Sequence, residues 1–496
     1  METACISKRK AVVTEMKTLF RPLCLALLLC LTSVPAAFAS EGGAHAIVSA
    51  TLPAWSIIPF VGMLLSIAIC PLVKPHWWEK NMLAVAIGWS LVFLVPFAAA
   101  YGMGEALFRL LESVLIDYVP FIVLLFGLFV VAGGIAVKGT LAGTPKINAL
   151  LLLIGTVLAS WVGTTGAAML MIRPVIKANA WRQKKVHVIV FFIFLVANIG
   201  GCLTPIGDPP LLMGFMRGVP FTWELQHLLP IMALNVVLLL AIYFVMDQRA
   251  YRKDLAAGRK PLNGGAKLRL SGAHNIVFML VIVLAVVLSG VLPGMPLFQN
   301  AAGDVLGIHI FGSVSLSYPT LIEIAMILAA AFLSFKTTKK DVRTKNNFTW
   351  GAIEEVAVLF IGIFITMIPA LLFLKAHGAD LGLTEPWQMF WATGALSSFL
   401  DNTPTYLVFM TTAGALGAAE GVVTTVGTIA VPMLIAISCG AVFMGANTYI
   451  GNAPNFMVKS IADENGVKMP SFFGYMAWSV GILIPVFLID TLLFFL

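Results

Sequence analysis

The chain has 496 residues, of which 60% are hydrophobic and only 11% are charged, and its formal net charge is +8. A mean hydropathy of +0.97 excludes an ordinary soluble domain. In a chain this apolar, basic residues set the orientation in the membrane, so the positive net charge does not indicate a nucleic-acid partner.

The first 39 residues form a segment of their own. From Met16, a basic start is followed by an apolar stretch and by small residues that end at Ala39. This pattern is typical of a cleaved secretory signal, and a start of translation at Met16 would leave it complete. An uncleaved first span is the alternative. A signal predicts a mature N-terminus in the periplasm and a chain in the bacterial inner membrane.

Apolar runs recur from residue 53 to the end of the chain, each long enough to cross roughly 30 Å of hydrocarbon. We predict an all-α polytopic membrane protein with ten spans, at 53–73, 81–101, 114–137, 186–216, 228–248, 273–292, 319–335, 351–374, 424–458 and 472–496. Two further apolar segments, 147–175 and 387–417, carry Gly, Thr and Asn breaks at their centres. We predict that these two are re-entrant hairpins.

The distribution of basic residues supports the hairpins. If both segments double back and residue 40 is outside, lysines and arginines should collect in alternate connections. The predicted outer connections hold only Arg109, Arg217 and Lys375, and the long connection 293–318 holds none. Treating either hairpin as a span would invert everything after it and remove this asymmetry.

A basic linker at 251–271, on the predicted cytoplasmic side, divides the chain into two repeats. The first repeat covers 40–250 and the second covers 272–496. Each has five spans, and an odd number places the second repeat upside down relative to the first. We interpret the linker as a solvated loop, with binding to acidic lipid or a partner as the alternative.

The two repeats carry matching motifs in the same order. Ser-Trp-Val-Gly-Thr-Thr-Gly at 160–166 corresponds to Ser-Phe-Leu-Asp-Asn-Thr-Pro at 398–404. Thr-Pro-Ile-Gly-Asp-Pro-Pro at 204–210 corresponds to Thr-Tyr-Ile-Gly-Asn-Ala-Pro at 448–454. Inverted repeats with broken helices at corresponding positions indicate the central site of a transporter.

Proline and glycine in the second pair of motifs prevent a continuous helix. Lipid offers no hydrogen bonds, so broken backbone at this depth must line a cavity enclosed by protein. The ends of the half-helices carry partial charges that can hold ions. Helix kinks that only aid packing are the alternative, and four paired motifs argue against it. The predicted substrate and ion site contains Thr164, Thr165, Thr204, Gly207, Asp208, Asp401, Asn402, Thr403, Thr448, Gly451 and Asn452.

Two carboxyls, Asp208 and Asp401, come from different repeats and decide the predicted substrate. If both face the cavity, the empty site is negative and repels citrate unless cations or protons neutralise it. In such a site the two aspartates could act as ligands of Na⁺ or Li⁺. Protons would compete with the metal ion for the same carboxylates. Either aspartate could instead cap the half-helix that follows it. Asn198, Asn447 and Asn455 flank the breaks and could be ligands or contacts between helices.

Two segments, NIGGCLTPIGDPP at 198–210 and SSFLDNTPT at 397–405, resemble the ion-transporter superfamily. That superfamily includes divalent-anion/sodium symporters, citrate transporters, arsenite permeases and NhaD-type sodium/proton antiporters. The resemblance covers nearly the whole chain after residue 50. It implies a homodimer with a scaffold part and a mobile transport part that carries its substrate by an elevator-like motion. The hairpin tips depart from the Ser-Asn-Thr of the anion symporters, which argues against a carboxylate substrate.

We therefore predict a secondary transporter, namely a sodium (or lithium)/proton antiporter with transported Na⁺ and H⁺ and no bound cofactor. The alternatives are a sodium-coupled citrate or dicarboxylate symporter and an arsenite efflux permease. The sequence shows no His-Glu-x-x-His, no Gly-x-Ser-x-Gly within a span and no ATP-binding P-loop, which argues against an enzyme. The expected partners are the small ion, the lipid bilayer and a second copy of the chain.

Overall fold

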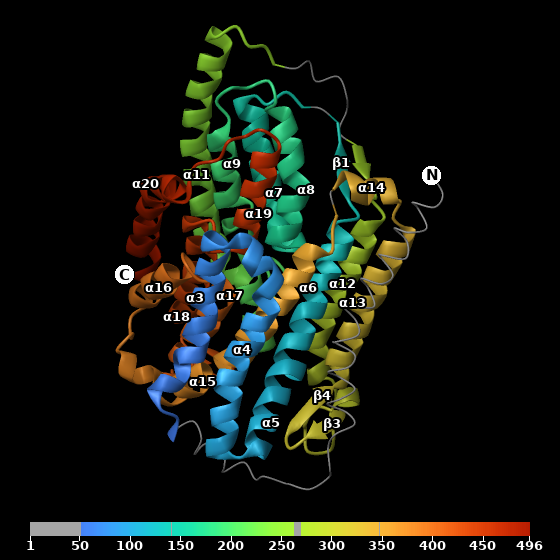
Figure 1. The fold of residues 1–496 in the computed structure, drawn as a ribbon, viewed down its shortest axis with the longest axis vertical. Helices are drawn as coiled ribbons and strands as arrows, with labels where there is room; N and C mark the ends of the chain where they lie inside the picture. The colour runs from blue at the N-terminus through green and yellow to red at the C-terminus, as the bar shows by residue number, and fades with distance from the viewer. Residues whose placement is uncertain (1–50, 140, 262–268, 347) are drawn as a thin grey trace.

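The structure is a computed structural model that describes residues 51–139, 141–261, 269–346 and 348–496 (Figure 1). The predicted signal at 1–39 lies outside the described residues. The helices up to the linker are α3 Ile58–Val73, α4 Pro75–Tyr101, α5 Met103–Leu111, α6 Val119–Ala132, α7 Pro145–Val162, α8 Thr164–Ala178, α9 Val186–Leu195, α10 Pro209–Met216 and α11 Trp223–Ala256. Those after it are α12 Asn275–Val291, α13 Tyr318–Thr337, α14 Lys340–Lys345, α15 Gly351–His377, α16 Pro386–Ser397, α17 Asn402–Ala415, α18 Val431–Met444, α19 Ala453–Glu464 and α20 Phe472–Asp490.

In the part of the chain that the structure describes, ten helices are long and apolar enough to cross a membrane. Nine of them coincide with predicted spans, which confirms a helical multi-pass membrane protein. The tenth, Pro145–Val162, is the first arm of the predicted hairpin 147–175. Helix α11 continues to Ala256, so the first residues of the predicted linker are helical.

The predicted span at 424–458 is wrong at its beginning. Residues Val422–Thr424 and Gly427–Ile429 form a β-hairpin, β5–β6, and the apolar helix begins only at Val431. The segment is rich in valine and threonine, whose branched side chains favour strands. Gly427, with φ +129°, supplies a torsion that other residues rarely adopt.

Two further antiparallel pairs of strands complete the described secondary structure. Strand β1 (Ala136–Lys138) pairs with β2 (Arg269–Ser271), and β3 (Gly307–Phe311) pairs with β4 (Val314–Ser317). All six strands are three to five residues long and lie in connections between helices. The architecture is therefore helical, with short strands only at the ends of the helices.

Both predicted hairpins double back. Helices α7 and α8 turn at Gly163, whose φ of +79° suits glycine, and their far ends meet where the Gly143 amide donates to the Ala178 carbonyl at 2.8 Å. In the second hairpin, α16 and α17 turn at 398–401. The turn before α16 returns to the end of α17, because Gly378 packs against Thr412.

Both predicted helix breaks are present. Helix α9 gives way to a 3-10 turn at Ile199–Leu203 (η3) before α10 begins, and α18 ends in a turn at Gly445–Asn447 (η7) before α19 begins. A proline lies in the first turn of each of the two following helices. A proline at the start of a helix loses no hydrogen bond, since the first amides have no partner within the helix. The prolines that interrupt the chain therefore also start the second half-helix.

The buried side chains form two large cores. The first is built from α7–α11 and α16–α20, and the second from α3, α4, α6, α12, α13 and α15. The second core also takes in Ile206, Leu212, Met213 and Leu407, which belong to the first break and the second hairpin. Figure 1 shows α6, α12 and α13 packed side by side, apart from the group of α7, α9 and α11. The helices of the two hairpins and of both breaks therefore all contribute to the first core, and the first break and the second hairpin also pack against the second core.

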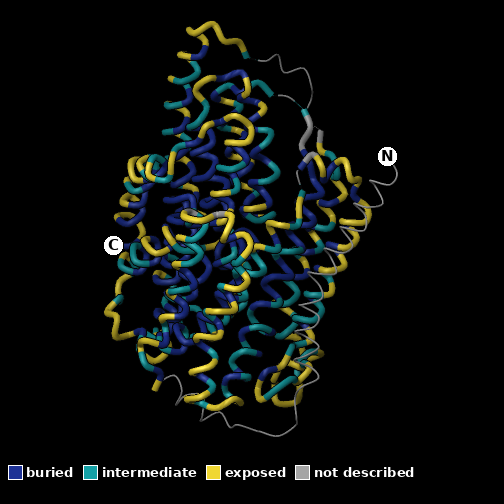
Figure 2. Tube along the Cα trace, in the orientation of Figure 1, coloured by how far each residue is buried: buried dark blue, intermediate teal, exposed yellow. Residues whose placement is uncertain are grey.

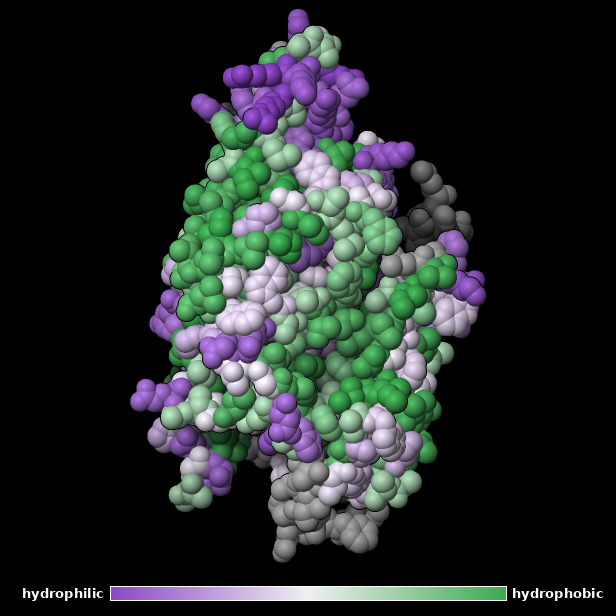
Figure 3. All heavy atoms as spheres, turned by 90° about the vertical axis from the view of Figure 1, so that its left-hand side faces the viewer, coloured by the Kyte–Doolittle hydropathy of each residue, from purple (hydrophilic) through white to green (hydrophobic). Residues whose placement is uncertain are grey.

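Helix α9 lies at the centre of the first core. Every residue from Val188 to Leu195 is buried, and Figure 2 shows the buried trace running through the interior. A helix that is apolar on all sides is expected to be surrounded by other elements. The outer surface is also apolar, as Figure 3 shows for one face, with hydrophilic residues gathered at the end where α11 projects.

Candidate functional site

The carboxyl of Asp208, in the first break, receives hydrogen bonds from three separate segments. Thr164 Oγ1 at the first hairpin tip donates to Oδ1 at 2.8 Å, and Asn402 Nδ2 at the second tip donates to Oδ2 at 2.6 Å. Asn452 Nδ2, in the second break, reaches Oδ1 at 3.4 Å. Asp208 is 1% exposed. The four motifs, far apart along the chain, therefore converge on one buried carboxyl.

A layer of asparagine amides connects the two breaks behind Asp208. Asn198 Nδ2 donates to Asn455 Oδ1 at 2.7 Å, and Asn452 Nδ2 lies 3.2 Å from Asn198 Oδ1. Asn455 Nδ2 donates in turn to the carbonyls of Gly445 and Thr448, at 2.8 and 2.9 Å. Asn198 and Asn455 are not in the predicted site, although their positions beside the breaks were a signal. Their side chains satisfy backbone carbonyls that the breaks leave free.

Thr204 and Thr448 hold each break against its hairpin in the same way. The Thr204 hydroxyl donates to the Ser160 carbonyl, and the Thr448 hydroxyl donates to the Ser398 carbonyl. The four residues occupy equivalent positions in the paired motifs. Thr204 and Thr448 are thus buried anchors of the backbone around Asp208 and make no direct contact with its carboxyl.

The two glycines of the predicted site lie where backbones touch. The Gly207 carbonyl accepts a hydrogen bond from the Thr164 amide at 2.8 Å. A Cβ at Gly207 would lie 2.2 Å from the Gly201 carbonyl oxygen, and one at Gly451 would lie 2.6 Å from the Gly445 oxygen. Only glycine fits at both positions without a backbone shift.

We expect Gly207→Ala to lower the free energy of unfolding by about 1–3 kcal/mol, the usual cost of an added methyl in a packed interior. The methyl must push the Gly201 carbonyl away and displace the neighbouring Asp208. Thermal unfolding of the purified protein in detergent would measure the change. Gly104→Ala is the matched control, because no atom lies within 4 Å of a Cβ there. Equal melting temperatures for the two variants would contradict the close packing at Gly207.

The second predicted carboxyl, Asp401, has a different setting. Its Oδ1 accepts a hydrogen bond from the Thr403 amide at 2.9 Å, so it caps the start of α17. Asp401 is also an electrostatic neighbour of Asp208. Thr403 Oγ1 reaches Asn402 Oδ1 at 3.5 Å, whereas Thr165 is exposed. The structure therefore groups Asp208 with Thr164, Asn402 and Asn452, and places Asp401, Thr403 and Thr165 beside them.

The cluster contains a carboxyl but no basic side chain. Within the described ranges, no lysine, arginine or histidine forms a hydrogen bond or an ion pair with Asp208. The described residues also hold no group of three or more His, Cys, Asp or Glu side chains that could hold a metal ion. The oxygens that could bind a cation here are one carboxylate, side-chain amides, hydroxyls and backbone carbonyls, which are the ligands that hard cations prefer.

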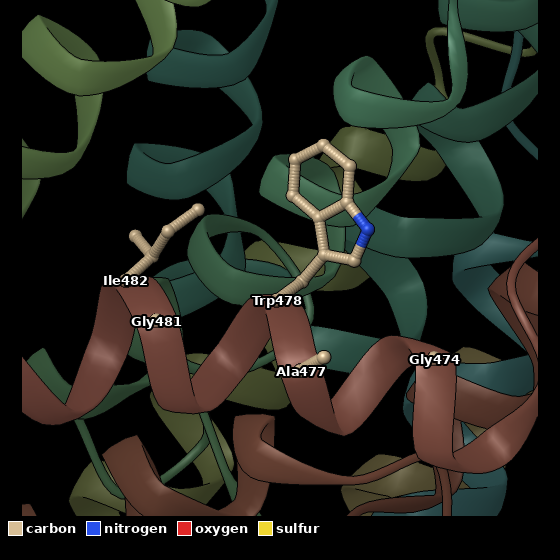
Figure 4. A pocket seen from close by; sticks show the side chains of 5 residues that line it. All are labelled: Gly474, Ala477, Trp478, Gly481 and Ile482. Carbon is tan, nitrogen blue, oxygen red and sulfur yellow. The ribbon is translucent and has the colours of Figure 1, made fainter.

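A surface groove is present elsewhere on the molecule. It has a volume of about 280 Å³ and is lined by residues of α20 alone, namely Gly474, Ala477, Trp478, Gly481 and Ile482 (Figure 4). No residue of the cluster around Asp208 lines it. The groove therefore adds nothing to the candidate site.

Comparison with known proteins places the chain in a transporter family. No curated protein matches it. A family model described as "Putative citrate transport" matches residues 49–495, which include both hairpins and both breaks. The chain therefore belongs to this family of citrate-transporter-type secondary transporters, within the ion-transporter superfamily that its motifs resemble.

Proposed function

We propose that the protein exchanges Na⁺ or Li⁺ for protons across the membrane, and that the cluster around Asp208 is the exchange site. The observation that carries the proposal is a buried carboxyl, reached by hydrogen bonds from three segments, with no basic partner among the described residues. An ionisable side chain at this depth in a membrane protein is by default functional. As part of the same proposal, a homodimer works in the bacterial inner membrane, with its mature N-terminus in the periplasm.

The hydrogen bonds to Asp208 leave it able to take either a proton or a metal cation. Hydroxyl and amide donors stabilise a carboxylate without neutralising it, so the site keeps one negative charge when empty. Burial also removes the carboxylate of Asp208 from the water and counter-ions that stabilise a carboxylate on the surface. A proton and a sodium ion therefore compete for the same oxygens, and this competition is sufficient for exchange.

The same charge opposes direct binding of citrate. Two like charges about 4 Å apart repel by roughly 4 kcal/mol at an effective dielectric constant near 20, and citrate carries up to three. A site for an anion usually offers arginine, lysine or free helix amides. Asn402 and Asn452 are neutral, so citrate would need bound cations to offset Asp208.

Sodium-coupled uptake of citrate or a dicarboxylate is the second candidate, and the description of the matching family favours it. In this alternative, Na⁺ at Asp208 would neutralise the site and the anion would bind beside it. The two candidates share the Na⁺ site and differ in whether a proton or an anion accompanies it.

Proteoliposomes with an acidic interior and an enclosed pH indicator would separate the candidates. Na⁺, Li⁺, K⁺ or citrate is added outside in separate runs, with protein-free liposomes as the control. We expect Na⁺ or Li⁺ alone to raise the internal pH, because protons leave as the cation enters. No response to any cation, together with Na⁺-dependent uptake of labelled citrate, would replace the antiporter with the symporter.

A further inference from the structure

A second buried carboxyl, that of Glu224, lies in the first core and plays no part in the cluster around Asp208. Glu224 belongs to the first turn of α11 and is 1% exposed. Neither of its carboxyl oxygens has a hydrogen-bond partner among the described protein groups. It also forms no ion pair with a described residue, whereas the buried Asp247 towards the other end of α11 pairs with Arg182.

No basic side chain of the described residues pairs with Glu224, and no hydrogen bond from them satisfies its carboxyl oxygens. Leu228, one turn further along α11, is fully buried. An ionised carboxylate in such a core costs several kcal/mol unless a cation or donors offset it. The start of α11 offers at most about 2 kcal/mol through the helix dipole. The carboxyl of Glu224 therefore holds a proton in this conformation.

The carboxyl of Glu224 is a poorer binding site for a metal cation than for a proton. A hard cation takes several oxygen ligands, and neither oxygen of Glu224 forms a hydrogen bond with a described residue. A proton needs only the carboxyl itself. The position is thus suited to carrying a proton and unsuited to a sodium ion.

The titratable side chains that face Glu224 connect it to the proposed exchange site. Cys202, in the turn η3, has both Asp208 and Glu224 as electrostatic neighbours, and Tyr406 on α17 has Glu224 as one. On α11 itself, His227 lies one turn further on and is partly exposed. All these groups except His227 are buried in the same core as the two hairpins.

We propose that Glu224 is a second proton-binding site, which takes up and releases a proton in each transport cycle beside the cation site. This inference rests on the proposed exchange of cations for protons and deepens it. It predicts that more protons move per cation than Asp208 alone could carry. A purely structural acid at this position would hold its proton throughout the cycle.

Glu224→Gln tests the proposal, because glutamine keeps the shape and removes the titration. We expect the variant to move about one proton fewer per Na⁺, which reversal-potential measurements in proteoliposomes would show. The control is Glu420→Gln, at an exposed glutamate, which should leave the ratio unchanged. An unchanged ratio in Glu224→Gln would overturn the proposal.

Infrared spectra of the purified protein give an independent readout if the variant does not transport. We expect the difference between wild type and Glu224→Gln to show a protonated carboxyl band at neutral pH that weakens at alkaline pH. No such band, or a band that persists at every pH, would overturn the proposal. If the wild-type protein moves no protons when Na⁺ is added, the proposed function fails, and the infrared titration still decides whether Glu224 binds and releases a proton.

Discussion

Asp208→Asn is expected to reduce sodium-driven proton movement by at least roughly 100-fold. Hydrogen bonds to a charged group contribute about 1.5–3 kcal/mol each, and every 1.4 kcal/mol is a tenfold change. Asparagine has the same shape but cannot bind a proton or offer a charge to Na⁺. The measurement is the initial rate of internal alkalinisation in proteoliposomes after addition of Na⁺, with the amount of reconstituted protein matched between samples.

Two further variants accompany Asp208→Asn: one is a control at an exposed carboxyl, and the other tests the second carboxyl of the predicted site. Asp380→Asn removes a carboxyl whose side chain is 78% exposed and should leave the rate unchanged. Asp401→Asn keeps the cap of α17, because asparagine caps a helix as well as aspartate does. A loss of exchange in Asp401→Asn would therefore reflect its charge. A rate in Asp208→Asn equal to that in Asp380→Asn would exclude Asp208 as the exchange group.

Arg182→Met is expected to lower the free energy of unfolding by about 3–5 kcal/mol, the usual result of removing one partner of a buried ion pair. The guanidinium contacts Asp247 on α11, and both side chains are 0% exposed. His187, Tyr243 and Asn148 also bond to Asp247, so this contact joins α7, α9 and α11. Without Arg182 the carboxylate of Asp247 stays buried and loses its guanidinium partner. Thermal unfolding in detergent would measure the loss.

The double variant Arg182→Met/Asp247→Leu should recover part of that stability, because only Asp254, which pairs with Arg182 at 3.3 Å, then lacks the guanidinium, whereas the single variant leaves two carboxylates without it. Lys459→Met provides a matched control: Lys459 pairs with Asp463 at 2.9 Å, but the side chains are 27% and 38% exposed. Exposed pairs contribute at most about 1 kcal/mol. A loss in Arg182→Met no greater than that in Lys459→Met would show that the buried pair does not hold these helices together.

The helical fold could be predicted from the sequence because the membrane restricts the chain to few structures. A backbone in lipid must satisfy its own hydrogen bonds, so long apolar runs become helices. The placement of basic residues then predicted that 147–175 and 387–417 double back. The β-hairpin at Val422–Ile429 was missed because its valines and isoleucine are as apolar as a span. Hydropathy does not separate a strand from the start of a helix over so few residues.

The sequence by itself determined where the helices break, since Pro209, Pro210 and Gly207 restrict the backbone whatever surrounds them. It also indicated that a polar site lies at the breaks. Only the tertiary structure decided which side chains meet: Asn402 and Asn452 are 194 and 244 residues from Asp208 and both donate to it. It likewise paired the buried Asp490 with Asn235, at 2.8 and 2.9 Å, and left Glu224 without a partner. Contacts of this kind depend on how helices pack, and packing is decided by the shapes of many side chains at once.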